Sequence, residues 1–228
     1  MFDLRFGPKG SSYIATNRFA QKSSDHDKIF IFQVGYGDGF KNHVGTEGQI
    51  EAYINSIWTH LQVNYCHSTL ESKVLIERLP GIKHYAGVTL KADIESVEKM
   101  FSHTAEDLGS ADLMLYMGFN KPNIKSGGGI AYVGAVCLES EEHIKDKLSI
   151  NCYGTSHSAM GELLAHEIGH NLGMDHDHDE IHGGEGGPCD GKGFMSYGNH
   201  WSRWSTCSVK DFTAHYTLHK SNWCLPGM

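Results

Sequence analysis

The sequence feature that most constrains this chain is the stretch 166–176, which reads HEIGHNLGMDH. If its first part is helical, His166 and His170 lie on the same face, about 6 Å apart along the axis. Gly173 can adopt a positive φ at low cost, so it can end the helix and turn the chain back. His176 would then face the other two imidazoles. The spacing predicts a three-histidine metal site rather than a solvated, histidine-rich helix.

Three imidazoles indicate a catalytic zinc ion, because structural zinc usually has four protein ligands and catalytic zinc keeps one position for water. Zinc lowers the pKa of this water to about 7 and polarises a substrate carbonyl. Glu167 is the candidate general base that activates the water and later carries its proton to the leaving amine. Read alone, Glu167 would be a surface carboxylate of a helix. We therefore expect one zinc ion per chain and hydrolysis of peptide bonds.

Two residues downstream of the signature are further candidates for the site. Met195 follows His176 at a distance typical of a Met-turn, and its apolar thioether suits a floor beneath the imidazoles better than a metal ligand. Filling the core is the alternative for this methionine. Tyr197 is either a packed turn residue or a group that stabilises the transition state.

Together these residues resemble the adamalysin (reprolysin) branch of the metzincins, which includes ADAM and venom metalloproteinases. Asp177, directly after the third histidine, is typical of that branch. The segment GIAYVGAVC at 129–137 resembles the family's strand and cysteine above the cleft, and WSTCS at 204–208 resembles its motif after the Met-turn. The similarity covers about 27 to 224, with specific motifs only after 129.

This resemblance implies a fold and an activity. The fold is α/β (α+β), a metzincin catalytic domain with a twisted, mixed five-stranded sheet, flanking helices and a small irregular C-terminal subdomain across a cleft. The activity is that of a secreted, extracellular zinc endopeptidase acting on extended peptides or proteins. A secreted toxin or adhesion module that keeps the fold without turnover, and an astacin-like protease, are the alternatives.

The resemblance also implies roles for single residues. Asp177 would be structural, bonding backbone in the C-terminal subdomain. Tyr197 stands where astacins and serralysins carry a tyrosine near zinc, although astacins usually place Glu after the third histidine. Many adamalysins bind calcium through a site that begins with Glu in the first strand. Because 28–36 contains no Glu, calcium is not predicted.

Six cysteines without a C-x-x-C pair favour three disulfides in an oxidising compartment over a zinc finger. Fifteen pairings are possible. The resemblance implies Cys137–Cys224 and Cys189–Cys207. Cys66 and Cys152 then remain, either as the third pair or as buried thiols.

The composition limits the partners. The chain has 228 residues, a net charge of −8 and a pI near 6.0, so it offers no basic patch for nucleic acid or an anionic membrane. No apolar run approaches the roughly 20 residues that span a bilayer, and 1–10 lacks the apolar region of a signal peptide. We expect a mature or truncated, monomeric chain. Residues 1–26 form a tail or arm before a catalytic domain at 27–228, divided into 27–173 and 174–228.

Apolar periodicity predicts the elements around the signature. We expect strands at 28–36, 70–79 (ended by Pro80-Gly81), 111–119 and 130–138, and helices at 46–65, 90–106, 158–172 and 210–220. The last of these strands would border the cleft as an edge strand. An extended substrate would then pair with Gly134, Ala135 and Val136, although an ordinary edge strand is the alternative.

Overall fold

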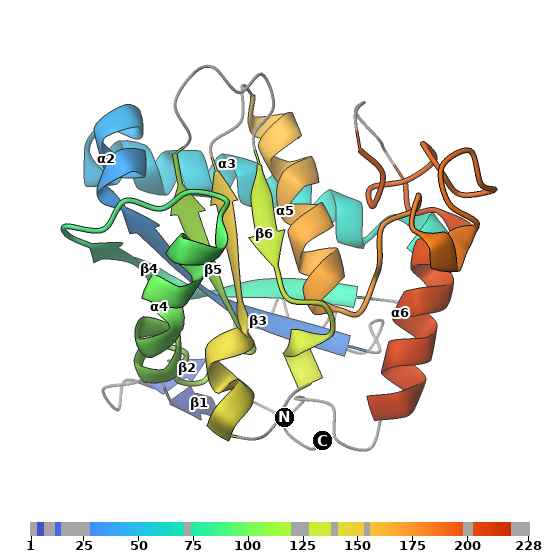
Figure 1. The fold of residues 1–228 in the computed structure, drawn as a ribbon. Helices are drawn as coiled ribbons and strands as arrows, with labels where there is room; N and C mark the ends of the chain where they lie inside the picture. The colour runs from blue at the N-terminus through green and yellow to red at the C-terminus, as the bar shows by residue number, and fades with distance from the viewer. Residues whose placement is uncertain are drawn as a thin grey trace.

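The computed structural model describes residues 4–6, 12–14, 28–70, 74–119, 128–137, 141–152, 156–197 and 203–219. Its centre is a five-stranded sheet with the strand order β4-β3-β5-β7-β6 (Figure 1). The strands are β3 (Lys28–Gly37), β4 (Val74–Tyr85), β5 (Leu113–Gly118), β6 (Gly129–Ala131) and β7 (Leu148–Cys152). Four strands are parallel, and β6 runs antiparallel to β7. The predicted mixed five-stranded sheet is confirmed.

Helices cover both faces of this sheet. The helices are α2 (Asp38–Val44), α3 (Glu47–Tyr65), α4 (Ile94–Asp107), α5 (His157–Asn171) and α6 (Thr206–His219). A separate two-stranded antiparallel sheet, β1 (Leu4–Phe6) with β2 (Ser12–Ile14), lies within the predicted N-terminal arm.

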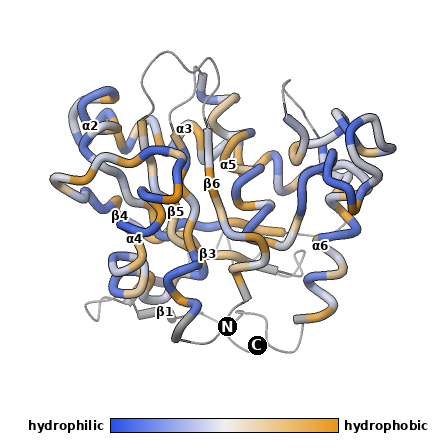
Figure 2. The backbone as a smooth tube through the Cα atoms, in the orientation of Figure 1, coloured by the Kyte–Doolittle hydropathy of each residue, from blue (hydrophilic) through white to orange (hydrophobic). Residues whose placement is uncertain are grey.

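Alternation along β3 produces two cores. Phe30 and Phe32 point to the face that α3 and α5 cover, whereas Ile31 points to the face that α4 covers. Successive side chains of a strand face opposite sides, so one sheet sits between two apolar layers. Figure 2 shows the contrast between β5, which is mostly hydrophobic, and the more hydrophilic α2 at the periphery.

α3 begins within one residue of the start of the helix predicted at 46–65. Thr46 is the N-cap: its hydroxyl accepts from the Gln49 backbone nitrogen, and the Gln49 side chain accepts from the Thr46 backbone nitrogen. This capping box satisfies two donors that a helix start leaves without partners. The long α3 packs against α5 and so supports the helix that carries the signature.

The structure corrects the predicted edge strand at 130–138. β6 ends at Ala131, because the next carbonyl, that of Tyr132, accepts from the side-chain amide of Asn171 in α5. Gly134 then has a φ of +72° and donates its N–H to the His170 carbonyl. Ala135 and Val136 are fully buried within a 3-10 helix, η2 (Ala135–Cys137), and do not form a strand.

Other elements also differ from prediction, among them α2, which was not predicted, and α6, which begins at Thr206 and not at 210. β4 continues through Pro80-Gly81 to Tyr85, because a register shift opposite Gln33 absorbs these residues and an edge strand tolerates a missing N–H. α4 begins at Ile94 rather than at 90, because Asp93 takes the N-cap position and accepts from the Ser96 N–H. β7 was missed, although it alternates Leu, Ile and Cys toward the core.

Candidate metal centre

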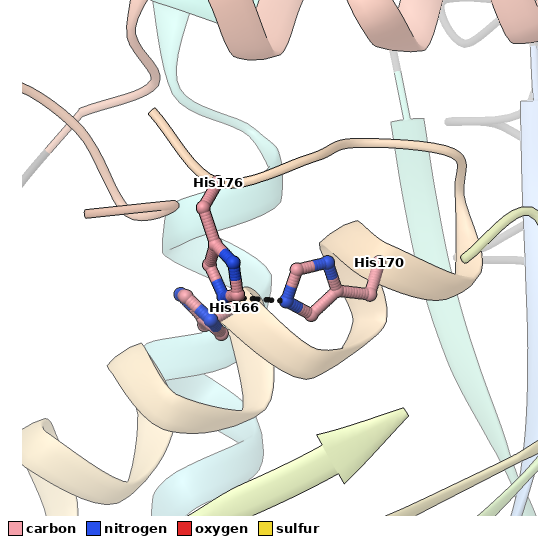
Figure 3. A group of neighbouring side chains, drawn as sticks. All are labelled: His166, His170 and His176. Carbon is pink, nitrogen blue, oxygen red and sulfur yellow. Dashed lines mark hydrogen bonds between the residues drawn. The ribbon is translucent and has the colours of Figure 1, made fainter. Parts of the chain in front are cut away.

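Three histidines from two segments form the centre of the site. His166 and His170 project from α5, and His176 reaches back toward them from the loop after the helix (Figure 3). One ring nitrogen from each lies within 4.8 Å of the others. The Nε2 atoms of His170 and His176 are 3.1 Å apart. Two nitrogens on a tetrahedral zinc ion stand about 3.3 Å apart, given Zn–N bonds of about 2.0–2.1 Å. The three rings therefore fit this ion.

Backbone carbonyls fix the tautomers of the two helical ligands. The Nδ1 atom of His166 lies 2.7 Å from the Phe194 carbonyl oxygen, and that of His170 lies 2.8 Å from the Met174 carbonyl oxygen. A carbonyl only accepts, so Nδ1 must carry the proton in both rings. Each Nε2 then presents a lone pair, as a metal ligand requires.

Burial keeps these rings neutral. It lowers the pKa of His166 to about 4 and that of His170 to about 3, and it also lowers the pKa of the more exposed His176. Neutral imidazole is the form that binds metal.

Glu167 is buried behind the ligands, against the edge strand. Its side chain is so close to β6 that a Cβ atom added at Gly129 would lie 2.3 Å from its Oε1. Burial raises the pKa of Glu167 to about 8, near the range that suits a group exchanging protons at neutral pH. The sequence indicated Gly129 only as part of a family motif. Gly129 leaves room for the Glu167 side chain, and only the contact between these two distant segments reveals this.

Met195 packs against α5 between the two helical histidines, and its role as the floor of the site stays a prediction. It is fully buried, and a Cβ added at Gly169 in α5 would lie 2.6 Å from its sulfur. The Met195 carbonyl accepts from the backbone nitrogen of Asp177, at 3.0 Å. The thioether thus packs against the helix between the two helical ligands rather than among the ligand nitrogens.

Asp177 joins the ligand loop to the Met-turn. Its carboxylate accepts hydroxyl hydrogen bonds from Ser205, from Ser208 at 3.1 Å and from Ser196 at 2.8 Å, all buried. The expected structural role is therefore met by serine side chains, where backbone partners had been predicted. These serines were not singled out, because hydroxyl residues far apart in sequence give no pattern that indicates a shared partner.

Tyr197 stands over the exposed side of the ligands. Its ring centroid is 4.6 Å from that of His176 and 4.5 Å from that of His178, and 66% of the residue is exposed. Partial burial, then the nearby charges of Asp179 and Glu167, raise the pKa of its phenol. Its role in catalysis stays a prediction.

The disulfide predictions have different outcomes. Cys189 and Cys207 are bonded, which ties the segment before the Met-turn to α6. No disulfide joins Cys66 to Cys152. Cys66 lies beside the start of β4 and Cys152 at the end of β7, so the two stand at opposite ends of the parallel strands. Cys224 lies outside the described residues, so the pair Cys137–Cys224 stays a prediction.

A comparison with protein families decides the assignment. Residues 51–177 match the family described as metallo-peptidase family M12B, reprolysin-like. The chain belongs to this reprolysin-like family. The match ends at Asp177, directly after the third ligand, so it includes the complete signature.

Two curated relatives, both named as metalloproteinases, agree with this assignment. The chain is 37% identical over 119 residues to human "Disintegrin and metalloproteinase domain-containing protein 9", covering 51% of this chain and 13% of that protein. It is 26% identical over 147 residues to "Zinc metalloproteinase-disintegrin-like atrase-A" of Naja atra, covering 60% of this chain and 22% of that protein. The similarity therefore spans less than a quarter of either relative.

A solved structure supports the fold alone. The chain "Structure of a chaperone-substrate complex" has a TM-score of 0.55 and 15% identity, and the likeness covers 86% of this chain and 34% of that one. Separately, none of the helices among the described residues is long and apolar enough to cross a membrane.

Proposed function

We propose that this chain is a zinc-dependent endopeptidase that hydrolyses peptide bonds in extended protein segments. The observation that carries the proposal is the convergence of His166, His170 and His176 beside the buried Glu167. When bound to these imidazoles, zinc supplies a Lewis acid that acts on water and on a peptide carbonyl. One ion per chain is expected at this site, and the remaining chemistry falls to the side chains around it.

Glu167 performs the proton transfers. It takes a proton from the attacking water as the new carbon–oxygen bond forms, and gives it to the amine nitrogen as the carbon–nitrogen bond breaks. Burial raises the pKa of its carboxyl to about 8, which allows the group to hold the proton between the two steps. The phenol of Tyr197, on the exposed side, is proposed to donate to the developing oxyanion.

The substrate is proposed to lie along β6. Gly129–Ala131 is the last strand of the sheet, and Gly129 contacts Glu167. An extended peptide can add to such an edge through main-chain hydrogen bonds, with little demand on its sequence. This placement replaces the one along Gly134, Ala135 and Val136, because Gly134 has a positive φ and the other two lie in a 3-10 helix, which cannot pair with a strand.

Secretion to the extracellular space is part of the proposal. The Cys189–Cys207 disulfide supports it, because disulfides persist in oxidising compartments.

A second function, zinc storage, has one observation in its favour. His176, His178 and Asp179 form another group whose ligand atoms lie within 4.8 Å of one another. The two groups share His176, however, so one ion at the first group removes a ligand from the second. Storage predicts several ions per chain, whereas the protease predicts one.

One experiment separates these functions. Cleavage of a quenched-peptide library is measured for native protein, for Glu167→Ala and for chelator-treated protein, together with the zinc content of each. We expect cleavage by native protein only, one zinc ion in native protein and in Glu167→Ala, and recovery when zinc is returned. Zinc-loaded native protein that cleaves no peptide would favour a binding module that keeps the fold.

A further inference from the structure

The third ligand needs support that a helix cannot give. His176 lies in the loop after α5, and contacts on its backbone hold it there. Its N–H donates to Oδ2 of Asp179 at 3.1 Å, and its carbonyl accepts from Nδ1 of His182 at 2.8 Å. The N–H of Asp175 donates to Oδ2 of Asp211 at 3.2 Å. Hydrogen bonds therefore hold the backbone on both sides of the His176 side chain.

Two of these partners are bonded to each other. The Nε2 atom of His182 lies 3.0 Å from Oδ2 of Asp211, and only 6% and 15% of the two side chains are exposed. His182 belongs to the short 3-10 helix η4 (Glu180–His182), whereas Asp211 belongs to α6. Their bond thus connects the ligand loop to a helix that follows the Met-turn.

The acceptors around His182 determine which of its ring nitrogens donate hydrogen bonds. A carbonyl and a carboxylate both accept, so each ring nitrogen of His182 donates. The imidazole is then doubly protonated and bonded on both sides, which fixes its orientation. Asp211 in turn accepts from the ring and from the Asp175 N–H, so one carboxylate fixes both ends of the loop.

From this geometry we propose that His182 and Asp211 are positioning residues for the zinc site, and that they hold His176 in the orientation in which its Nε2 faces those of the helical ligands. They touch neither the ion nor the substrate. The inference rests on the proposed zinc site but not on peptide cleavage. His166 and His170 keep their own supports, the Phe194 and Met174 carbonyls, when the pair is lost.

Loss of the pair should therefore weaken zinc binding without abolishing it. Changes to the groups that orient metal ligands typically reduce metal affinity 10–100-fold. We expect His182→Ala and Asp211→Ala to lose zinc 10–100 times faster than native protein. His182→Asn places an amide nitrogen near the position of Nδ1, so it keeps the bond to the His176 carbonyl and recovers part of the loss.

The chain provides a matched control in a second histidine–carboxylate pair. His84 and Asp38 are joined by a 2.7 Å contact between Nε2 and Oδ1, in β4 and α2, away from the ligand loop. His84→Ala breaks an equivalent pair and should leave zinc dissociation unchanged. A general loss of stability would affect both variants, whereas loosening of the third ligand affects only the first.

The test measures zinc transfer from each protein to a chelating dye, with circular dichroism and thermal midpoints as the check of folding. Faster transfer from His182→Ala and Asp211→Ala, partial rescue in His182→Asn and no change in His84→Ala support the inference. Native transfer rates in a folded His182→Ala or Asp211→Ala, or an equal effect of His84→Ala, overturn it. Native protein that retains zinc but cleaves no peptide refutes the proposed function and leaves this result intact.

Discussion

The two halves of the metal centre are built in different ways. His166 and His170 stand one turn apart on α5, whose backbone fixes their spacing, and their Nδ1 atoms bond nearby carbonyls. His176 stands on a loop and depends on Asp179, His182 and Asp211, the last of which comes from another helix. The helical half is determined by local sequence, whereas the loop half is determined by tertiary contacts. Changes in the two halves should therefore have different consequences.

The largest effect is expected for chemistry carried by the helical half. Glu167→Gln keeps the size of the side chain and removes the general base, so cleavage should fall by about 10²–10⁴-fold. Zinc content and thermal midpoint should be native, because the ligands and their supporting carbonyls are unchanged. Cleavage assays with metal analysis check this. Loss of zinc together with activity would mean that Glu167 supports the metal and that the two halves are not separate.

A smaller loss of activity is expected when a substitution in a neighbouring strand displaces Glu167. In Gly129→Ala the new methyl group would meet the Glu167 carboxyl, at 2.3 Å from Oε1, and must displace it. A displacement of about 1 Å can reduce catalysis roughly 10²-fold. We expect a lower kcat with zinc affinity retained.

The control for this variant is Gly48→Ala in the first turn of α3, where an added Cβ meets nothing within 4 Å. It should leave kcat unchanged. If Gly129→Ala cleaves like native protein, the edge strand does not determine the position of the base.

In the loop half, Asp177→Asn should reduce the free energy of unfolding more than it reduces peptide cleavage. Ser196 Oγ already accepts from the Lys192 N–H at 3.1 Å, so its own hydrogen must go to Asp177. An amide nitrogen at that carboxylate oxygen would place donor against donor, while the other oxygen serves Ser205 and Ser208. We expect a loss of about 2 kcal/mol in the free energy of unfolding, measured by chemical denaturation. A native value would show that the Met-turn does not depend on this carboxylate.

The same contrast explains what the sequence could predict. The signature predicted that His166 and His170 would face the same way, because i and i+4 positions of a helix always share a face. With His176 they do converge, while the role of Glu167 stays a proposal. The short β6 was not predictable, since the amide of Asn171, in another element, takes the carbonyl that would continue the strand. Gly129 and the His182–Asp211 pair were missed for the same reason. Their meaning depends on which distant segment they touch, and no local periodicity encodes that.

The smallest effect is expected outside both halves, at the start of α4. Asp93 caps this helix by accepting from the Ser96 N–H at 2.8 Å, and Asp93→Ala should cost about 1 kcal/mol. The bonds from Ser96 lower the pKa of Asp93, so its contribution is complete at neutral pH and is lost as the pH falls through that lowered value. The difference between native protein and Asp93→Ala should therefore shrink in acid.

Asp93→Asn is the matched control, because asparagine caps equally well and does not titrate. Its stability relative to Asp93→Ala should not depend on pH, whereas that of native protein should. Denaturation curves at neutral and acidic pH measure both differences, and zinc dissociation should be native in each variant. A change in zinc dissociation would show that zinc binding depends on the stability of the whole domain. The helical and loop halves could then not be treated as separate.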